Sequence, residues 1–452
     1  MFRKELPLIA IVCAIWTYNL QAEQIHSAWV GGPSSWWEDK YNWDPFEFMS
    51  DGPDNFLGEL GHSYVVTINK PPQSIDEVTV GLSYSHTIDR LDCYGKVNLE
   101  NWSDHYVCLS IPESNPPYQP DVNCLANHGD LSVGQIDIRG DVINLAKLGF
   151  GEHINIFGNL YNEAGATITV DMTDIDVEEG GEVYNDGLIQ IYTVGGIGET
   201  PYFHNNGEIQ LFIGGGCNGA IFDNDGAAVI RGSGVVSGHQ LQNRGMICAS
   251  MGPLLLYFEG SLTNTGTLKN DVGATLHIAD GIGAPMADVN NQGTIEVNAG
   301  GSITFDCNLV NDPNALINLL GGTLAAEKLT QKPGATLQGF GGITTDVLIS
   351  PNGIIKFTGP TNVVGDVNIS EGATLEVSDG TTLVTGHCTC TEGTIHMIGG
   401  RIIPQGGFTN NNCNVIWEPG LYTNIADFNL DGKVNLKDFT YFADTWLRQA
   451  GL

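Results

Sequence analysis

A twelve-residue segment near the C-terminus has the residue types and spacing of a calcium-binding loop. Side-chain oxygens stand at positions 1, 3 and 5, a glycine at position 6 permits the sharp turn, and position 7 offers its backbone carbonyl. Positions 9 and 12 are also oxygen-bearing, and three carboxylates suit Ca²⁺ while serving Mg²⁺ poorly. The predicted ligands are Asp427, Asn429, Asp431, Lys433, Asn435 and Asp438.

A short amphipathic helix is predicted directly after this loop, because apolar residues recur there at helical spacing. These residues are Leu436, Phe439, Phe442, Trp446 and Leu447. The last ligand, Asp438, falls on the first turn of that helix, so calcium should order the helix and its loss should melt it. The alternative is a solvated acidic turn without metal.

The phrase Asp-x-Asn-x-Asp-Gly-x-Val-Asn-x-x-Asp at 427–438 resembles one repeat of a type I dockerin. An ordinary EF-hand loop usually has Glu at position 12. In the dockerin family two such repeats dock onto a cohesin and attach polysaccharide-degrading enzymes to a scaffold. The resemblance therefore implies bound calcium and a cohesin-like or cell-surface partner. A single repeat leaves three roles open, namely a terminal tag, a cap of the fold, or a surface-attachment element.

The chain that precedes this calcium loop has a sequence repeat with a period of about 20 residues, which is typical of a solenoid. The repeat contains an Asn followed by Gly two or three residues later, and the residue two positions before each Asn is apolar. The Asn positions are Asn162, Asn185, Asn205, Asn224, Asn243, Asn264, Asn291 and, without its glycine, Asn311.

One coil per repeat explains this register, with strands stacked about 4.8 Å apart. Residues such as Phe203 and Ile209 should point inward and stack on their equivalents. The Asn should occupy a corner that needs a left-handed backbone or a side-chain-to-backbone bond, and the Gly two residues on should tolerate positive φ. Stacked Asn side chains should also hydrogen-bond along the column. We therefore predict an all-β fold, a parallel β-helix or β-solenoid. The alternative is a β-sandwich or propeller.

The period persists after Asn311 with a different phrase, beginning at Gly334, Gly353, Gly372 and Gly393. Cys390 and Cys413 are about one coil apart, which places their Cα atoms within reach of a disulfide. The alternative is two unpaired buried thiols.

The N-terminus reads as an export signal over residues 1–22, with Arg3 and Lys4 before an apolar run and Ala22 at the end. The run is shorter than the roughly 20 residues needed to span a bilayer. We expect an extracellular or cell-surface protein without a transmembrane segment after cleavage. The remaining divisions are a cap region at 23–130, solenoid repeats at 131–415, and the calcium loop with its helix at 421–452.

Tryptophans dominate the start of the cap region, at Trp29, Trp36, Trp37 and Trp43. Their Trp-Gly-Gly…Asn-Trp context resembles the opening found in front of many bacterial extracellular β-solenoid proteins. A solenoid needs such a cap because its first coil otherwise exposes an edge. The alternative is a platform on which sugar rings stack.

The net charge limits the partners. There are 52 acidic and 18 basic residues, and the formal charge is −34. This field repels phosphate backbones, which excludes nucleic acid as a natural partner and favours cations.

The sequence gives only weak signals for catalytic or zinc-binding residues. An acidic run could serve glycoside acid–base chemistry, bind calcium, or form a solvated face. It comprises Asp171, Asp174, Asp176, Glu178, Glu179 and Glu182. A zinc site at His387, Cys388, Cys390 and His396 lacks a second ligand pair with metal-like spacing.

The sequence thus favours a secreted, non-catalytic solenoid, either structural and adhesive or glycan-binding, with a calcium-binding tail. The alternative is a dockerin-bearing enzyme or accessory protein of polysaccharide breakdown, a glycoside hydrolase or lyase on a β-helix. Polygalacturonase-like enzymes carry an Asp-Asp pair and an Arg-Ile-Lys phrase, and neither occurs here.

Overall fold

The computed structural model describes residues 124–418, with gaps at 151–152, 172, 179, 193–194, 281–287 and 350, together with parts of 23–110 and Thr440. The export signal and the calcium loop lie outside the described residues. The chain divides into two compact units, Met1–Leu241 and Gln242–Leu452.

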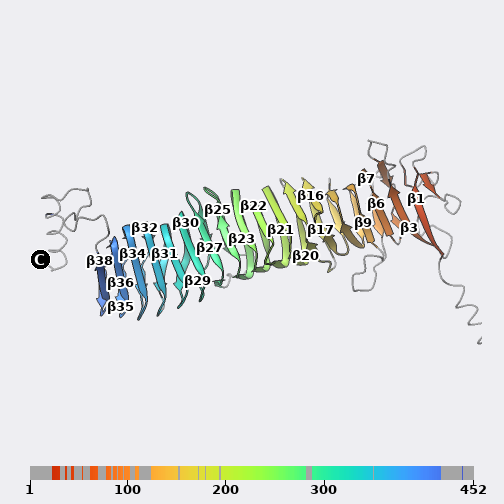
Figure 1. The fold of residues 1–452 in the computed structure, drawn as a ribbon. Helices are drawn as coiled ribbons and strands as arrows, with labels where there is room; N and C mark the ends of the chain where they lie inside the picture. The colour runs from red at the N-terminus through yellow and green to blue at the C-terminus, as the bar shows by residue number, and fades with distance from the viewer. Residues whose placement is uncertain are drawn as a thin grey trace, which may run out of the picture. The chain divides into compact units, whose positions relative to one another are not determined.

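The first unit is a stack of parallel coils in which a strand pairs with its equivalent in the next coil (Figure 1). One column of paired strands comprises β1 (Glu23–Trp29), β3 (His62–Asn69), β6 (Arg90–Tyr94), β9 (Cys124–Asn127), β12 (Asp141–Asn144), β15 (Leu160–Asn162), β18 (Val183–Asn185), β20 (Gly195–Asn205) and β21 (Glu208–Asn224). A second comprises β4 (Val78–Leu82), β7 (Lys96–Asn101), β10 (Asp130–Gly134), β13 (Lys147–Phe150), β16 (Thr167–Asp171), β19 (Leu188–Tyr192) and again β21. A third comprises β5 (His86–Thr87), β8 (Val107–Ser110), β11 (Ile136–Arg139), β14 (Ile154–Ile156), β17 (Asp174–Val177) and again β20. The short β2 (Trp43–Asp44) pairs antiparallel with β1, and β22 spans Val229–Asn243.

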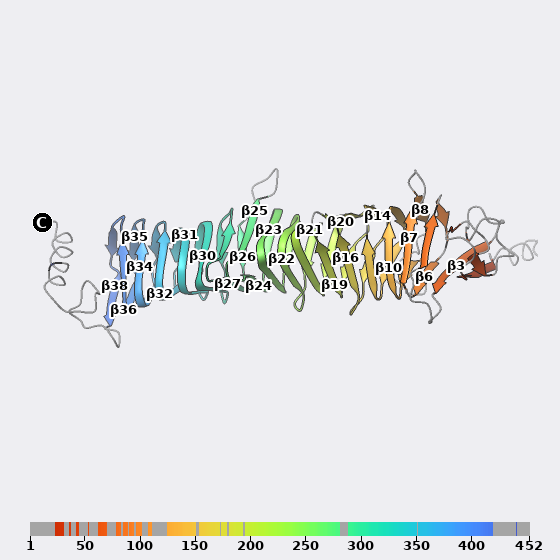
Figure 2. The same ribbon diagram turned by 90° about the horizontal axis from the view of Figure 1, so that it is seen from above.

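The second unit repeats this architecture, and its strands from β30 to β38 lie side by side in both Figure 1 and Figure 2. Its strands are β23 (Met246–Asn264), β24 (Thr267–Asn270), β25 (Thr275–Asp280), β26 (Val289–Asn291), β27 (Thr294–Asn298), β28 (Ser302–Phe305), β29 (Leu309–Asn311), β30 (Leu316–Gln331), β31 (Thr336–Ile349), β32 (Ile354–Val364), β33 (Val367–Ile369), β34 (Thr374–Val384), β35 (Cys388–Thr391), β36 (Thr394–Pro404), β37 (Phe408–Asn411) and β38 (Asn414–Glu418).

The predicted apolar columns are present, which confirms the β-solenoid. Val183 is in register with Phe203, and Phe203 with Phe222, and all three are fully buried. The rings of Phe203 and Phe222 are stacked, with centroids 4.5 Å apart. Burial of each such side chain contributes about 1.5–3 kcal/mol. Because one coil cannot cover its own inner face, the free energy of the fold resides in contacts between neighbouring coils.

The Asn side chains form the predicted ladder, and every member is buried. In the first unit it runs through Asn127, Asn144, Asn162, Asn185, Asn205 and Asn224. In the second unit it runs through Asn243, Asn264, Asn291, Asn311 and Gln331. Gln331 is followed in register by Ile349, and its Nε2 is buried without a hydrogen-bond partner.

The structural reason for the glycine two residues after the Asn differs from the predicted one. Gly187, Gly207 and Gly266 do not adopt a left-handed backbone. A Cβ on Gly207 would lie 2.1 Å from the carbonyl oxygen of Gly187 in the preceding coil, and one on Gly266 would lie 2.0 Å from that of Gly245. These three glycines are therefore required by the close approach of stacked corners, and the expectation of positive φ was wrong for them.

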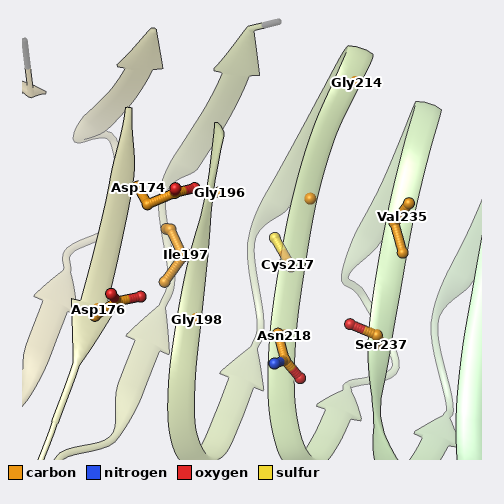
Figure 3. A pocket seen from close by; sticks show the side chains of 11 residues that line it. Asp174, Asp176, Gly196, Ile197, Gly198, Gly214, Cys217, Asn218, Val235 and Ser237 are labelled. Carbon is orange, nitrogen blue, oxygen red and sulfur yellow. The ribbon is translucent and has the colours of Figure 1, made fainter. Parts of the chain in front are cut away.

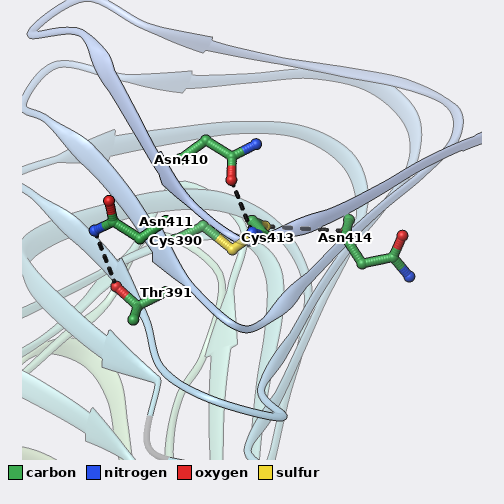
Figure 4. The surroundings of a disulfide bond; sticks show 6 residues. All are labelled: Cys390, Thr391, Asn410, Asn411, Cys413 and Asn414. Carbon is green, nitrogen blue, oxygen red and sulfur yellow. Dashed lines mark hydrogen bonds between the residues drawn. A yellow bond between two sulfur atoms is a disulfide. The ribbon is translucent and has the colours of Figure 1, made fainter.

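A disulfide joins Cys390 to Cys413, with Cα atoms 5.5 Å apart (Figure 4). Cys390 lies on β35, and Cys413 lies between β37 and β38 in the next coil. The spacing of one coil therefore placed the two cysteines correctly. The link fastens the last described coil to the one before it.

Candidate functional site

An open groove of about 290 Å³ lies on the outer surface of the first unit (Figure 3). Its floor is glycine-rich, and Asp174 and Asp176 of β17 stand on one side of it. Asn218 of β21 and Ser237 of β22 stand on the other side. The acidic run of the sequence thus contributes two carboxylates to a concave surface.

The register between coils creates this groove. Asp174 is in register with Gly196, and Gly196 with Gly216, so two missing side chains follow a carboxylate along one outward row. In the neighbouring row Asp176 is followed by Gly198. A side chain at Gly196 would place its Cβ 2.7 Å from the carbonyl oxygen of Gly216. The hollow therefore results from missing side chains, and at Gly196 the packing of the next coil requires the glycine.

The electrostatics of the groove are acidic. None of the eleven described residues that line it is basic or aromatic. His153 approaches from outside the lining, with its Nε2 3.7 Å from Oδ2 of Asp176. Carboxylates and backbone groups can accept hydrogen bonds from sugar hydroxyls or attract cations, whereas they repel uronates. The groove thus lacks the Lys or Arg that a lyase uses beside an acidic sugar.

Aromatic side chains on the outer face stack on one another. The Tyr184 ring lies between those of Tyr161 and His204, with centroids 5.0 and 4.7 Å away and planes within 9° of parallel. Tyr192 and Phe212 form a second stack at 4.3 Å. A sugar ring needs a free aromatic face, and the neighbouring rings cover both faces of Tyr184.

The Tyr184 hydroxyl donates a hydrogen bond to the Glu182 carboxylate. Burial, followed by this bond, raises the pKa of Tyr184 above its usual value. His204 Nε2 is 3.4 Å from the same carboxylate. Glu182, a third member of the acidic run, therefore supports the aromatic stack and does not line the groove.

The N-terminal tryptophans form a packed cluster. Trp37 and Trp43 are fully buried, Trp29 is nearly so, and both Trp29 and Trp37 contact the Trp43 ring edge-on. The indole N–H of Trp37 donates to the Pro53 carbonyl oxygen at 3.1 Å, and that of Trp43 donates to the Trp37 carbonyl oxygen at 2.8 Å. Of the four, Trp36 is exposed. This burial favours a structural role over a sugar-binding platform.

The suspected zinc ligands have other roles. Cys390 is in the disulfide and Cys388 is buried in the interior. His387 is hydrogen-bonded to Thr409 and to the Gly406 carbonyl, and His396 lies 3.0 Å from Glu418. In the described part of the chain, no group of three or more His, Cys, Asp or Glu could hold a metal ion.

The predicted calcium ligands Asp427, Asn429, Asp431, Lys433, Asn435 and Asp438 lie outside the described residues. The calcium loop therefore stays a prediction from the sequence. Among the described residues, no helix has the length and apolar character needed to cross a bilayer.

Three members of the ladder were missed by the sequence reasoning: Asn127, Asn144 and Gln331. Each has an apolar residue two positions earlier, as the others do, and this signal would have found them. Asn144 lacks a glycine two or three residues on, and Gln331 is not an asparagine, whereas Asn127 has the full pattern with Gly129.

Comparison with known proteins found no matching family model, curated protein or solved structure. What can be inferred about function therefore rests on the coils, the groove and the C-terminal motif.

Proposed function

We propose that the protein is an exported, non-catalytic β-solenoid that serves a structural or adhesive role at the cell surface, with a calcium-binding C-terminal segment. The observation that carries the proposal is that conspicuous side chains on the coils bind their own equivalents in neighbouring coils. The Asn ladder and the Tyr161–Tyr184–His204 stack are examples. Such side chains stabilise a scaffold and are not free to act on a substrate.

The C-terminal loop supplies the attachment in this proposal. Three carboxylates and further oxygen ligands in a twelve-residue loop suit calcium at extracellular concentrations. If the loop folds only with calcium bound, then binding of a cohesin-like or cell-surface partner depends on the presence of calcium. The excess of acidic residues over basic ones supports a role outside nucleic-acid binding.

Calcium titration of the full mature chain, followed by its retention on cells, tests the proposal. We expect the wild type to bind calcium at the tail and to leave the cell surface after chelation. Asp427→Ala with Asp431→Ala should abolish both behaviours, while Asp444→Ala, an acidic change outside the loop, should preserve them. Full retention of the double variant without calcium would contradict the attachment role.

A second candidate function, glycoside hydrolysis, is favoured by one observation, the Asp174 and Asp176 pair in the groove. Successive outward positions on a strand are about 6.6 Å apart. This separation is close to that of the two carboxylates in inverting glycosidases. Release of reducing ends from neutral glycans, lost in both Asp174→Asn and Asp176→Asn but kept in Asp186→Asn, would establish this function. No release by the wild type favours the structural proposal.

A further inference from the structure

Interior columns of the second unit end in apolar side chains that are exposed. One column runs from Leu375 through Ile395 to Val415, whose exposed fractions are 1%, 4% and 45%. Another leads from Val377 through Met397 to Trp417, and the exposed fraction rises from 0% to 50%. These side chains occupy core positions but have no further coil above them among the described residues.

A different face of the same coil has the same property. Val367 and Cys388 are buried at successive positions of a column that ends at Phe408, whose exposed fraction is 43%. Together Phe408, Val415 and Trp417, here called the terminal apolar face, are the uncovered end of a hydrophobic core. An apolar patch of this kind on a soluble protein marks a surface that another segment covers. The last described strand, β38, also presents a sheet edge, which natural proteins cover or disrupt.

We infer that the C-terminal segment 421–452 of the same chain docks on the terminal apolar face and caps the solenoid. Two residues separate this segment from Glu418, where β38 ends, so it is tethered beside the face. Because the connection is short, the segment has a high effective concentration at the terminal apolar face. A separate partner would lack this advantage.

The chemistry and dimensions of the segment fit the face. Its predicted helix carries one stripe of large apolar residues, with Phe439, Phe442 and Trp446 at its centre. Twelve helical residues extend about 18 Å. The five residues of β38 extend about 17 Å, so the stripe can run the length of the exposed strand. The stripe buries its own apolar side chains in the same contact, because a single helix cannot cover them.

This inference goes beyond the proposed function and needs neither export nor a calcium partner. The calcium loop at 427–438 precedes most of the stripe, so loop and stripe can act separately. Capping by segment 421–452 does not require that the tail bind a cell. Conversely, a tail that fails to cap the solenoid could still bind calcium. Calcium titration of each variant below therefore distinguishes the two proposals.

Hydrogen exchange of the full mature chain, followed by mass spectrometry of peptides from 405–418, tests the cap. Phe442→Ser should accelerate exchange there by about tenfold or more, since losing burial of one large apolar side chain corresponds to at least that factor. Tyr441→Ser is the matched control, because Tyr441 lies on the opposite face of the predicted helix and its loss should change nothing.

The reciprocal substitution completes the test. Trp417→Ser should accelerate exchange in peptides from 436–447 to a similar extent, whereas Ile416→Ser, on the outward row that includes His396, should not. Unchanged exchange in both directions would overturn the inference. Protection of 405–418 that rises with protein concentration and ignores Phe442→Ser would also overturn it, in favour of a second copy covering the face.

Discussion

Asn185 donates a side-chain hydrogen bond of 2.7 Å to Oδ1 of Asn205, one coil further along, and accepts an equivalent bond from Asn162. The amide is suited to this because it carries a donor and an acceptor at its two ends, so one residue type can repeat indefinitely along the column. The same Nδ2 lies 3.3 Å from the Glu208 carbonyl oxygen. Each amide therefore ties the corner of one coil to the next.

Asn185→Ala should destabilise the coils around it by about 2–4 kcal/mol. The substitution removes the amide that accepts from buried Asn162 and donates to buried Asn205, so both lose a hydrogen-bond partner. Asn206→Ala is the matched control. Its amide donates to Asp186 at an exposed position, so its loss should cost less than about 0.5 kcal/mol. Hydrogen exchange of peptides covering 183–211 measures both, since unfolding of a repeat protein is local. Equal effects of the two substitutions would show that the ladder contributes no special stability.

Gly207→Ala should open the stack at its corner. The added Cβ would lie 2.1 Å from the Gly187 carbonyl oxygen, and backbone atoms cannot move aside as a flexible side chain can. Gly226 also lies two residues after its ladder asparagine, Asn224, but its corner is two residues longer, and a Cβ there would meet nothing within 4 Å. Gly226→Ala should therefore be neutral or slightly stabilising, through reduced freedom of the unfolded chain. Thermal unfolding of the two variants compares them directly, and a neutral Gly207→Ala would contradict the close-approach explanation.

The repeat allowed much of this fold to be predicted, because a period of about 20 residues leaves few alternatives to stacked coils. The pattern identified Asn185 and Phe203 as column members and Cys390 and Cys413 as neighbours. It could not reveal why Gly207 is a glycine, since a left-handed backbone and a close approach select the same residue. The groove was also beyond the sequence, because Asp174 and Ser237 come together only when the register between coils is known.

Loss of the Cys390–Cys413 disulfide should loosen the last described coil. The bond closes a segment of 23 residues, for which loop-closure entropy gives about 3 kcal/mol. Cys413→Ser should therefore accelerate exchange of amides in β37 and β38. A reductant should reproduce the effect in the wild type and add nothing to the variant, which separates loss of the bond from damage by the substitution. A reductant-insensitive wild type would indicate that stacking alone holds this coil.

The buried thiols should make the protein less stable at alkaline pH, and Cys388 offers the clearest test. Burial raises the pKa of its thiol from the ordinary value of 9.0 to about 11. Between these values the folded state keeps a proton that the unfolded state has lost. The stability from this difference is therefore complete below about pH 9 and is lost as pH rises through about 11.

The expected slope for one thiol is up to about 1.4 kcal/mol per pH unit in this window. Other groups titrate here too, so the informative quantity is the difference between wild type and Cys388→Ala in denaturant unfolding at pH 8 and pH 10. The wild type should lose more stability across this interval, because the cavity left by the substitution costs the same at both pH values. Native Cys388 should also resist alkylation at pH 8, since the thiolate is the reactive form. Equal pH dependence in both proteins, together with rapid alkylation, would show that Cys388 reaches solvent and that the last coils open readily.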